Sequence, residues 1–508
     1  MHFPRSSGIL LHPTSLPGPF GIGDLGSEAR RFACFLAAAG QTLWQVLPLG
    51  PTGYGDSPYQ CFSAIAGNPL LISPELLRDR GWLEASDLAD RPDFRAHEVD
   101  FARVIPWKTT LLERAARRFF AGSSADDHAA FDLFCHREEA WLDEFALFMA
   151  LKRQHGMVAW TRWESGARSR HPQALAAWRE KLAEPIAIQK FLQFVFFDQW
   201  RGLRDYCRAR HIRLMGDLPI YVAHDSADVW ANPHFFYLEP DGSPTVVAGV
   251  PPDYFSATGQ LWGNPIYRWD ALAEDGYGWW LHRFRAVLNL VDMVRLDHFR
   301  GFEAYWEVPG TELTAENGRW VKGPGGALFG VLQQALGDLP LVAENLGVIT
   351  PEVEAIRARF GFPGMAILQF AFGADPQGPS FRPHNYPREM VAYSGTHDCD
   401  TTVGWWTSEG QGDSTRTAEQ ILQERQFARE YLNTDGRDIH WVFIRALLAS
   451  VAATVLVPFQ DVLGLGSTAR FNQPATPSGN WRWRCAPDSF AQEHAEKLWQ
   501  LTGFYDRR

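Results

Sequence analysis

Four carboxylate side chains follow short apolar runs in this sequence of 508 residues. Asp217, Asp297 and Glu344 each end such a run, and Asp398 follows another run directly after His397. A single acidic residue at the end of a strand is unremarkable, but several brought together raise one another's pKa and cost stability. Because proteins accept that cost mainly at functional sites, we interpret these residues as candidates for catalysis.

Two of the carboxylates have the surroundings that cleavage of a glycosidic bond with retention requires. In that reaction one carboxylate attacks the anomeric carbon, and a second, about 5–5.5 Å away, protonates the leaving oxygen. Arg295 precedes Asp297 by two residues, so both side chains share one face of a strand and the cation keeps the nucleophile ionised. Glu344 follows the apolar residues 341–343 and has no cation beside it in sequence, which favours the acid/base role.

The remaining polar residues suit contacts with a sugar. Asp398 is expected to hydrogen-bond sugar hydroxyls and to stabilise a distorted ring, with His298 and His397 as further donors. A metal site at the two histidines is the alternative, but the sequence has no HExxH pattern and no Cys/His cluster. We therefore do not expect a metal at the two histidines.

The elements that must position these residues are eight apolar runs, typical of parallel strands buried on both faces. Helical patterns separate most of them, although the connection after the sixth run is mostly irregular. Alternating strands and helices predict an α/β fold, a (β/α)8 TIM barrel whose active site lies at the carboxyl ends of the strands. The runs cover residues 8–12, 43–49, 212–218, 293–297, 341–344, 366–370, 391–395 and 454–459.

Large insertions interrupt the predicted barrel, most clearly between its second and third strands. We predict a catalytic barrel from residues 1–50 and 186–508, with residues 51–185 as an inserted, mostly helical subdomain. Residues 222–275 and 461–485 are predicted to be smaller excursions over the active site. The motif GxGxxG at residues 21–26 is interpreted as a loop, because it does not directly follow a strand as a dinucleotide site requires.

Several motifs resemble those of known glucan-active enzymes. Arg-Leu-Asp at 295–297, Ala-Glu-Asn at 343–345 and Thr-His-Asp at 396–398 resemble the nucleophile, acid/base and stabiliser motifs of the α-amylase clan. Asp217 lies where that clan keeps its first motif.

Three longer stretches narrow the resemblance to the 4-α-glucanotransferases, or amylomaltases, of glycoside hydrolase family 77. Residues 44–68 resemble the donor-side loop of that family, and residues 250–265 (VPPDYFSATGQLWGNP) match it as well. Residues 464–484 (GLGSTARFNQPATPSGNWRWR) resemble the flexible loop that covers its cleft. The resemblance extends over nearly the whole chain.

That family consists of intracellular, retaining disproportionating enzymes without a metal or organic cofactor, and its substrates are α-1,4-glucans and malto-oligosaccharides. The resemblance implies that Tyr59 and Trp262 line the sugar subsites with Ser57 nearby, and that Asn472 and Pro474 lie on the covering loop. Arg295, His298, His397 and Asp217 complete the expected substrate-binding set. Phe471 and Ala475 depart from the Met and Gly of the family's loop, which bears on loop conformation and product range.

Composition limits the partners and the compartment. The net charge of −11 and the absence of a basic cluster argue against nucleic acid and against an anionic membrane surface. Six dispersed cysteines, no evident signal peptide and no apolar run long enough to span a bilayer favour a soluble, cytoplasmic protein. We expect a monomer.

Four alternatives stay open at this stage. The same carboxylates would serve a plain α-glucan hydrolase or debranching enzyme, and a decayed barrel would serve a non-catalytic glucan-binding protein. Asp217 is as well interpreted as a structural residue as a sugar ligand. Tyr59 and Trp262 could be core aromatics, and only the resemblance favours the subsite interpretation.

Overall fold

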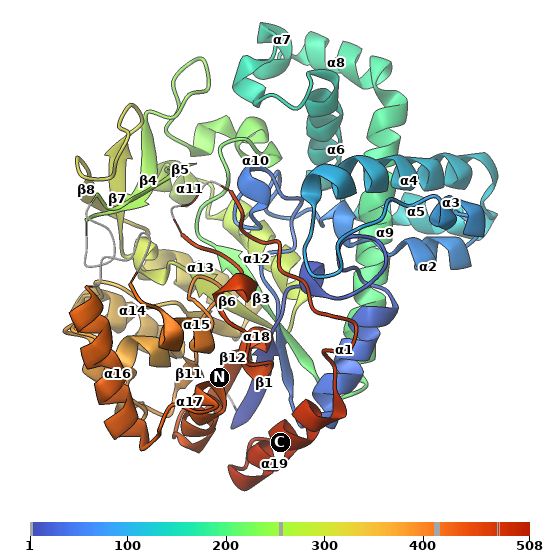
Figure 1. The fold of residues 1–508 in the computed structure, drawn as a ribbon. Helices are drawn as coiled ribbons and strands as arrows, with labels where there is room; N and C mark the ends of the chain where they lie inside the picture. The colour runs from blue at the N-terminus through green and yellow to red at the C-terminus, as the bar shows by residue number, and fades with distance from the viewer. Residues whose placement is uncertain (1–3, 253–257, 411–416, 475, 477) are drawn as a thin grey trace.

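The computed structural model describes residues 4–252, 258–410, 417–474, 476 and 478–508. Its central sheet has eight parallel strands in the order β10-β11-β12-β1-β2-β3-β6-β9 (Figure 1). All eight predicted strands are confirmed. They are β1 Ser6–Leu10, β2 Leu43–Gln45, β3 Arg213–Pro219, β6 Met293–Asp297, β9 Leu341–Ala343, β10 Gly364–Ile367, β11 Met390–Tyr393 and β12 Thr454–Pro458.

The sheet curves until its two edge strands meet. The backbone N–H of Ala343 in β9 donates to the carbonyl of Pro363, just before β10, at 2.9 Å. The side chain of Asn345 accepts from the backbone N–H of Met365 in β10 at 2.8 Å. These bonds bring β9 and β10 together, so the predicted (β/α)8 barrel is confirmed.

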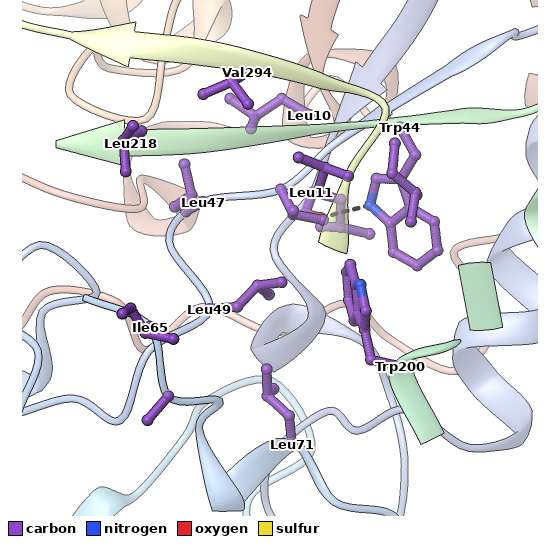
Figure 2. Packing of buried hydrophobic residues seen from close by; sticks show 14 of the residues in the cluster. Leu10, Leu11, Trp44, Leu47, Leu49, Ile65, Leu71, Trp200, Leu218 and Val294 are labelled. Atoms are coloured by element: carbon purple, nitrogen blue, oxygen red, sulfur yellow. Dashed lines mark hydrogen bonds between the residues drawn. The ribbon is translucent and has the colours of Figure 1, made fainter. Parts of the chain in front are cut away.

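The side chains of alternate residues in each strand belong to two different hydrophobic cores, because successive side chains of a strand point to opposite faces. Leu43, Met215 and Met293 belong to a cluster that β2, β3, β6, β9, β10, β11 and β12 build inside the barrel. Trp44 belongs to the larger core between the strands and the helices, where its indole N–H donates to the carbonyl of Leu11 at 2.8 Å (Figure 2). Burial on both sides explains why the strands read as continuous apolar runs.

The helices that follow the strands agree with the predicted patterns. The predicted ones are α1 Ser27–Ala38, α9 Ala183–Arg208, α12 Gly278–Leu290, α13 Gly326–Leu336, α14 Pro351–Phe360, α17 Ile439–Ala449 and α19 Gln492–Phe504. α14 begins after Thr350 with Pro351 in its first turn, a position where proline is favoured. In the described part of the chain, no helix is both long and apolar enough to span a bilayer.

Two regions differ from the regular alternation. After β10 the chain forms three 3-10 turns, Leu368–Ala371, Gly378–Phe381 and Pro383–Asn385, which agrees with the irregular connection expected there. After β11 it forms α15 Thr402–Thr407 and α16 Ala418–Leu432, neither of which was predicted from the sequence. α18 Phe459–Val462 follows β12.

A group of helices between β2 and β3 lies beside the barrel, at the upper right of Figure 1. It contains α2 Pro74–Asp79, α3 Ala85–Ala89, α4 Phe101–Gly122, α5 Ala125–Arg137, α6 Glu139–Gln154, α7 Ser165–Arg168 and α8 Pro172–Lys181. These helices pack mainly on α9, whose first residues precede the proposed boundary at 185/186. We keep the division into a barrel and an inserted subdomain as a proposal.

A second sheet, not predicted from the sequence, lies above the barrel opposite the inserted helices (Figure 1). Its antiparallel strands have the order β5-β4-β7-β8 and comprise β4 Val246–Val250, β5 Gln260–Pro265, β7 Ala304–Pro309 and β8 Arg319–Lys322. The short helices α10 Ala227–Ala231 and α11 Trp269–Glu274 flank β4 and β5 in the chain. The sequence signal was weak because the strands are short and β8 is mostly exposed.

One arginine fastens the end of the chain to the amino-terminal face of the barrel. The guanidinium of Arg507 is fully buried and donates to six backbone carbonyls. The acceptors are Ser6, Leu447, Leu448, Ser450, Ala452 and Ala453. The bonds therefore connect β1, the start of β12 and the end of α17.

We expect Arg507→Met to lower the free energy of unfolding by roughly 2–4 kcal/mol, because it removes six hydrogen bonds from a buried guanidinium to backbone carbonyls. Urea unfolding followed by tryptophan fluorescence measures the change. Arg508→Met is the matched control, since that residue is exposed. Equal midpoints for the two variants would contradict the assigned role of Arg507.

Candidate active site

The four carboxylates lie at the carboxyl ends of barrel strands, as predicted. Asp217 is near the end of β3, and Asp297 is the last residue of β6. Glu344 directly follows β9, and Asp398 lies five residues after β11. Because β3, β6 and β9 are neighbours in the sheet, their ends converge on one region of the barrel.

Arg295 connects two of these carboxylates. Its Nη1 lies 2.7 Å from Oδ2 of Asp217 and 2.9 Å from Oδ1 of Asp297. The side chain of Asp217 is completely buried, whereas that of Asp297 is 26% exposed. Burial lowers the pKa of Arg295, but the charges of the two carboxylates outweigh it and raise that pKa well above its ordinary value.

The buried side chain of Asp217 binds neighbouring side chains of the site. Its Oδ2 accepts a hydrogen bond from the hydroxyl of Tyr59 at 2.8 Å in addition to the bond from Arg295. Burial raises the pKa of Asp217, while Arg295 acts in the opposite direction. Of the two interpretations that the sequence left open for Asp217, these contacts favour the structural one.

Glu344 is nearly enclosed and is held by two backbone donors. The N–H of His298 donates to Oε2 at 2.8 Å, and the N–H of Leu346 donates to Oε1 at 3.0 Å. Burial raises the pKa of Glu344 to about 8, even though Arg295 lies close enough to lower it. The sequence places no cation next to Glu344, but Arg295 lies close to it in the structure. The pKa of Glu344 is therefore raised by burial and not by the absence of a neighbouring cation.

His298 has a left-handed backbone, with φ at 51°, which is uncommon for a residue with a side chain. This conformation turns the chain sharply after β6 and directs the N–H of His298 at Glu344. Burial lowers the pKa of the imidazole to about 4, so it is neutral at pH 7. The ring of Trp262 meets it edge-on, with the ring centroids 4.8 Å apart.

Asp398 has two polar side-chain partners, His397 and Asn472. Nε2 of His397 is 3.3 Å from its Oδ2, and the side-chain amide of Asn472 donates to Oδ1 at 2.6 Å. Burial acts to raise the pKa of Asp398, but His397, Asn472 and Arg295 together hold it well below its usual range. Asp398 is therefore an ionised acceptor.

An aromatic cluster stands beside Asp398. The ring of Tyr59 stacks on His397 at 4.9 Å, and Trp481 is tilted against both rings at 5.9 Å. Ser57 supports this group, because its Oγ accepts from the backbone N–H of Tyr59 at 3.2 Å. Tyr59 is thus part of the site and not an isolated core aromatic.

The covering loop reaches the site through Asn472. Pro474 lies two residues further on and is half-buried, whereas Ala475 lies outside the described residues. Residues 253–257 of the stretch 250–265 are also outside the described part.

Two residues of this loop were not identified from the sequence. Arg470 donates to the carbonyls of Asn472 and Asp398, both at 2.6 Å, and so fastens the loop to the site. Trp481 is buried with φ at 63°. An irregular loop has no periodicity that shows which residues face inward, so nothing in the sequence alone distinguished them.

The histidines do not form part of a metal-binding cluster within the described residues. No three His, Cys, Asp or Glu side chains are grouped there in a way that could hold a metal ion. His397 instead lies against Asp398 and Tyr59, and His298 supports Glu344. The described site is built from carboxylates, Arg295, two histidines, Asn472 and aromatic rings.

Comparison with known proteins agrees with this geometry. A family described as 4-alpha-glucanotransferase matches residues 11–489. The 4-alpha-glucanotransferase of Thermus thermophilus is 50% identical over 506 residues, covering 98% of each chain. That of Synechocystis is 49% identical and covers 99% of this chain and 98% of its own.

Solved structures give the same result. Amylomaltase from Streptococcus agalactiae, in complex with acarbose, superimposes with a TM-score of 0.93 at 38% identity, covering 99% of both chains. Amylomaltase from Corynebacterium glutamicum has a TM-score of 0.80 at 21% identity, covering 99% of this chain and 75% of its own, and supports the fold. The chain therefore belongs to the family of 4-alpha-glucanotransferases and is an enzyme of that class.

Proposed function

We propose that this enzyme transfers segments of α-1,4-glucan to glucose or to another α-1,4-glucan by a retaining double displacement. The observation that carries the mechanism is the contrast between two neighbouring carboxyl groups. Arg295 places its positive charge 2.9 Å from Asp297, whereas burial raises the pKa of Glu344 to about 8. At pH 7 such a pair provides an anionic nucleophile and a protonated acid.

The first step breaks the glycosidic bond. A carboxylate oxygen of Asp297 attacks C1 of the donor sugar while the proton of Glu344 passes to the departing glycosidic oxygen. The result is a covalent glycosyl-Asp297 ester and a free glucan fragment. In the second step Glu344 takes the proton of an acceptor hydroxyl, whose oxygen attacks C1 and releases Asp297.

The other site residues position the sugars. Asp398 accepts hydrogen bonds from sugar hydroxyls as the ring distorts, and His397 and Asn472 hold it in place. Nε2 of the neutral His298 is buried and has no hydrogen-bond partner among the described residues, and we assign it a hydrogen bond to a sugar hydroxyl. We assign the sugar-binding surface to Tyr59, Trp262, Ser57 and Pro474, with Arg295 and Asp217 supporting it from behind.

The chain carries all of these residues itself, which is consistent with an active monomer. The amylomaltase from Streptococcus agalactiae was solved with acarbose, and we propose that acarbose also occupies the cleft of this enzyme.

Transfer requires that water be kept from the glycosyl-enzyme while a sugar enters. The contacts of Arg470 with the main chain of Asp398 and Asn472 make it a positioning residue for the covering loop. We expect Arg470→Met to increase the hydrolysis-to-transfer ratio about ten-fold, since it removes two charge-assisted hydrogen bonds. Reducing-sugar release compared with total glucose release from maltotriose measures this ratio, and an unchanged ratio would exclude the role.

The acid role of Glu344 predicts a specific pH dependence. The protonated form is the active one, so kcat/KM for malto-oligosaccharides should fall about ten-fold per pH unit above pH 8. A donor such as α-maltosyl fluoride needs no proton on its leaving group, so the rate of its first step should stay level through the same range. A matching alkaline decline for both donors would contradict this assignment.

A trapping experiment tests the covalent step. Glu344→Gln mixed with α-maltotriosyl fluoride should form the glycosyl-enzyme and then stall, because the base of the second step is missing. Mass spectrometry of the intact protein should show one added maltotriosyl group, and peptide mapping should place it on Asp297. The double variant with Asp297→Asn is the control, and a label on Asp217 or Asp398 would reject the proposed nucleophile.

A further inference from the structure

A tryptophan on the second sheet combines exposure with a fixed orientation. Trp320 in β8 is 39% exposed. The guanidinium carbon of Arg300 lies 3.8 Å from its ring centroid, and Trp306 of the paired strand β7 meets it edge-on at 5.2 Å. Because the guanidinium covers one face of the indole, the opposite face is the one left open.

Arg300, the cation that covers Trp320, lies in a segment that also supports the active site. Arg300 lies in the short 3-10 helix Phe299–Phe302, which directly follows His298. Its Nη1 donates at 2.6 Å to the carbonyl of Val348, four residues after Glu344. Arg300 is itself buried, so it fixes Trp320 relative to both segments that hold the acid/base residue.

The sheet carries aromatic rings at both of its edges. Trp262 in β5 contacts His298, and Trp320 lies in β8 at the other end of the order β5-β4-β7-β8. Three interstrand spacings separate these two strands, roughly 14 Å. Trp262 and Trp320 therefore lie at opposite edges of the sheet, each against one end of the segment from His298 to Arg300.

We propose that Trp320 is an acceptor-side subsite that stacks on a sugar ring of a long α-1,4-glucan. The proposal rests on the proposed function, because it needs an acceptor that enters on the side of Glu344. The donor sugar is assigned to Asp398, which has Asn472, His397 and Tyr59 beside it. Arg300, which follows His298 and donates to the carbonyl of Val348, lies against the ring of Trp320.

The chemistry of the surface fits this occupant. The flat indole presents an apolar face to the C–H groups of a glucose ring, and its fixed orientation reduces the entropy lost on binding. Lys322, two residues along β8, projects from the same face of the strand and is paired with Glu303. Its exposed ammonium supplies a donor for sugar hydroxyls beside the ring.

The test compares acceptors of increasing length at a constant donor, α-maltosyl fluoride. Glucose reaches only the reaction centre, whereas maltoheptaose extends outward over the sheet. We expect Trp320→Ala to raise the KM for maltoheptaose about five- to ten-fold more than the KM for glucose. Trp320→Phe keeps an aromatic face and should recover most of the loss.

Trp499→Ala is the matched control. Trp499 is 44% exposed and is also covered by an arginine, with Arg508 at 4.1 Å, but it lies on α19 near Gly40, which precedes β2. This control should leave both KM values unchanged, and thermal unfolding should show that each variant is folded.

Two results would overturn the subsite. Equal changes for glucose and maltoheptaose would mean that Trp320 acts through Arg300 on the reaction centre, and no change for either would mean that no sugar stacks there. Failure of the proposed function is recognised separately, because the wild-type enzyme would then form no transfer product with any acceptor.

Discussion

Asp297→Asn is expected to reduce kcat for maltotriose on the order of 10⁵-fold, because it removes the nucleophile of the first step. The amide keeps the shape of the side chain and a partner for Arg295, so the cleft should stay intact. Binding of acarbose or maltoheptaose, measured by calorimetry, should therefore persist. The kinetic constant is obtained from glucose release at saturating maltotriose.

Asp292→Asn provides the matched control for this loss. Asp292 precedes the same strand, β6, at its other end, where it accepts from Arg204, Arg208 and the backbone N–H of Leu214. Its substitution should lower stability and leave kcat near the wild-type value. Transfer at a wild-type rate by verified Asp297→Asn protein would refute the assignment of the nucleophile.

Glu344→Gln is expected to lower kcat/KM for maltotriose about 10²–10⁴-fold, since the amide cannot donate a proton to the leaving oxygen. With α-maltosyl fluoride the first step should be much less affected, because fluoride departs without a proton. Burst kinetics of fluoride release separate this step from the second one. Glu307→Gln, a change at a buried glutamate that pairs with Arg319 outside the carboxylate cluster, should affect neither donor.

The same substitution should also change stability in a pH-dependent way. Burial raises the pKa of Glu344 from 4.5 to about 8, so between these values folding takes up a proton that the unfolded chain has released. Glutamine avoids this cost. Glu344→Gln should therefore raise the melting temperature relative to wild type at pH 8, and the gain should vanish below pH 4.5. A gain of equal size at both pH values would show that burial of the carboxyl group is not its source.

The barrel and its carboxylates could be predicted because each is tied to a simple local pattern. Strands buried on both faces must be apolar throughout, and a polar residue that ends such a strand lies at the carboxyl-terminal mouth. The expected proximity of Arg295 and Asp297 follows from the two-residue period, and their 2.9 Å contact agrees with it.

Other features could not be predicted, because they depend on contacts between residues that are distant in sequence or on strands with a weak pattern. The strands of the second sheet are short, and β8 has a mostly exposed pattern that resembles a loop. The role of Arg470 requires the covering loop to fold back onto Asp398, some seventy residues away in sequence. The raised pKa of Glu344 arises from burial, although Arg295, which is distant in sequence, lies close enough to oppose it.

The most direct test of transfer by double displacement is incubation of the purified wild-type enzyme with maltotriose alone, followed by separation of the products by size. We expect glucose together with a ladder of oligosaccharides longer than three units, at a nearly constant number of reducing ends. Glucose and maltose as the sole products, with reducing ends rising steadily, would show that water takes the glycosyl group and would contradict the proposed transferase.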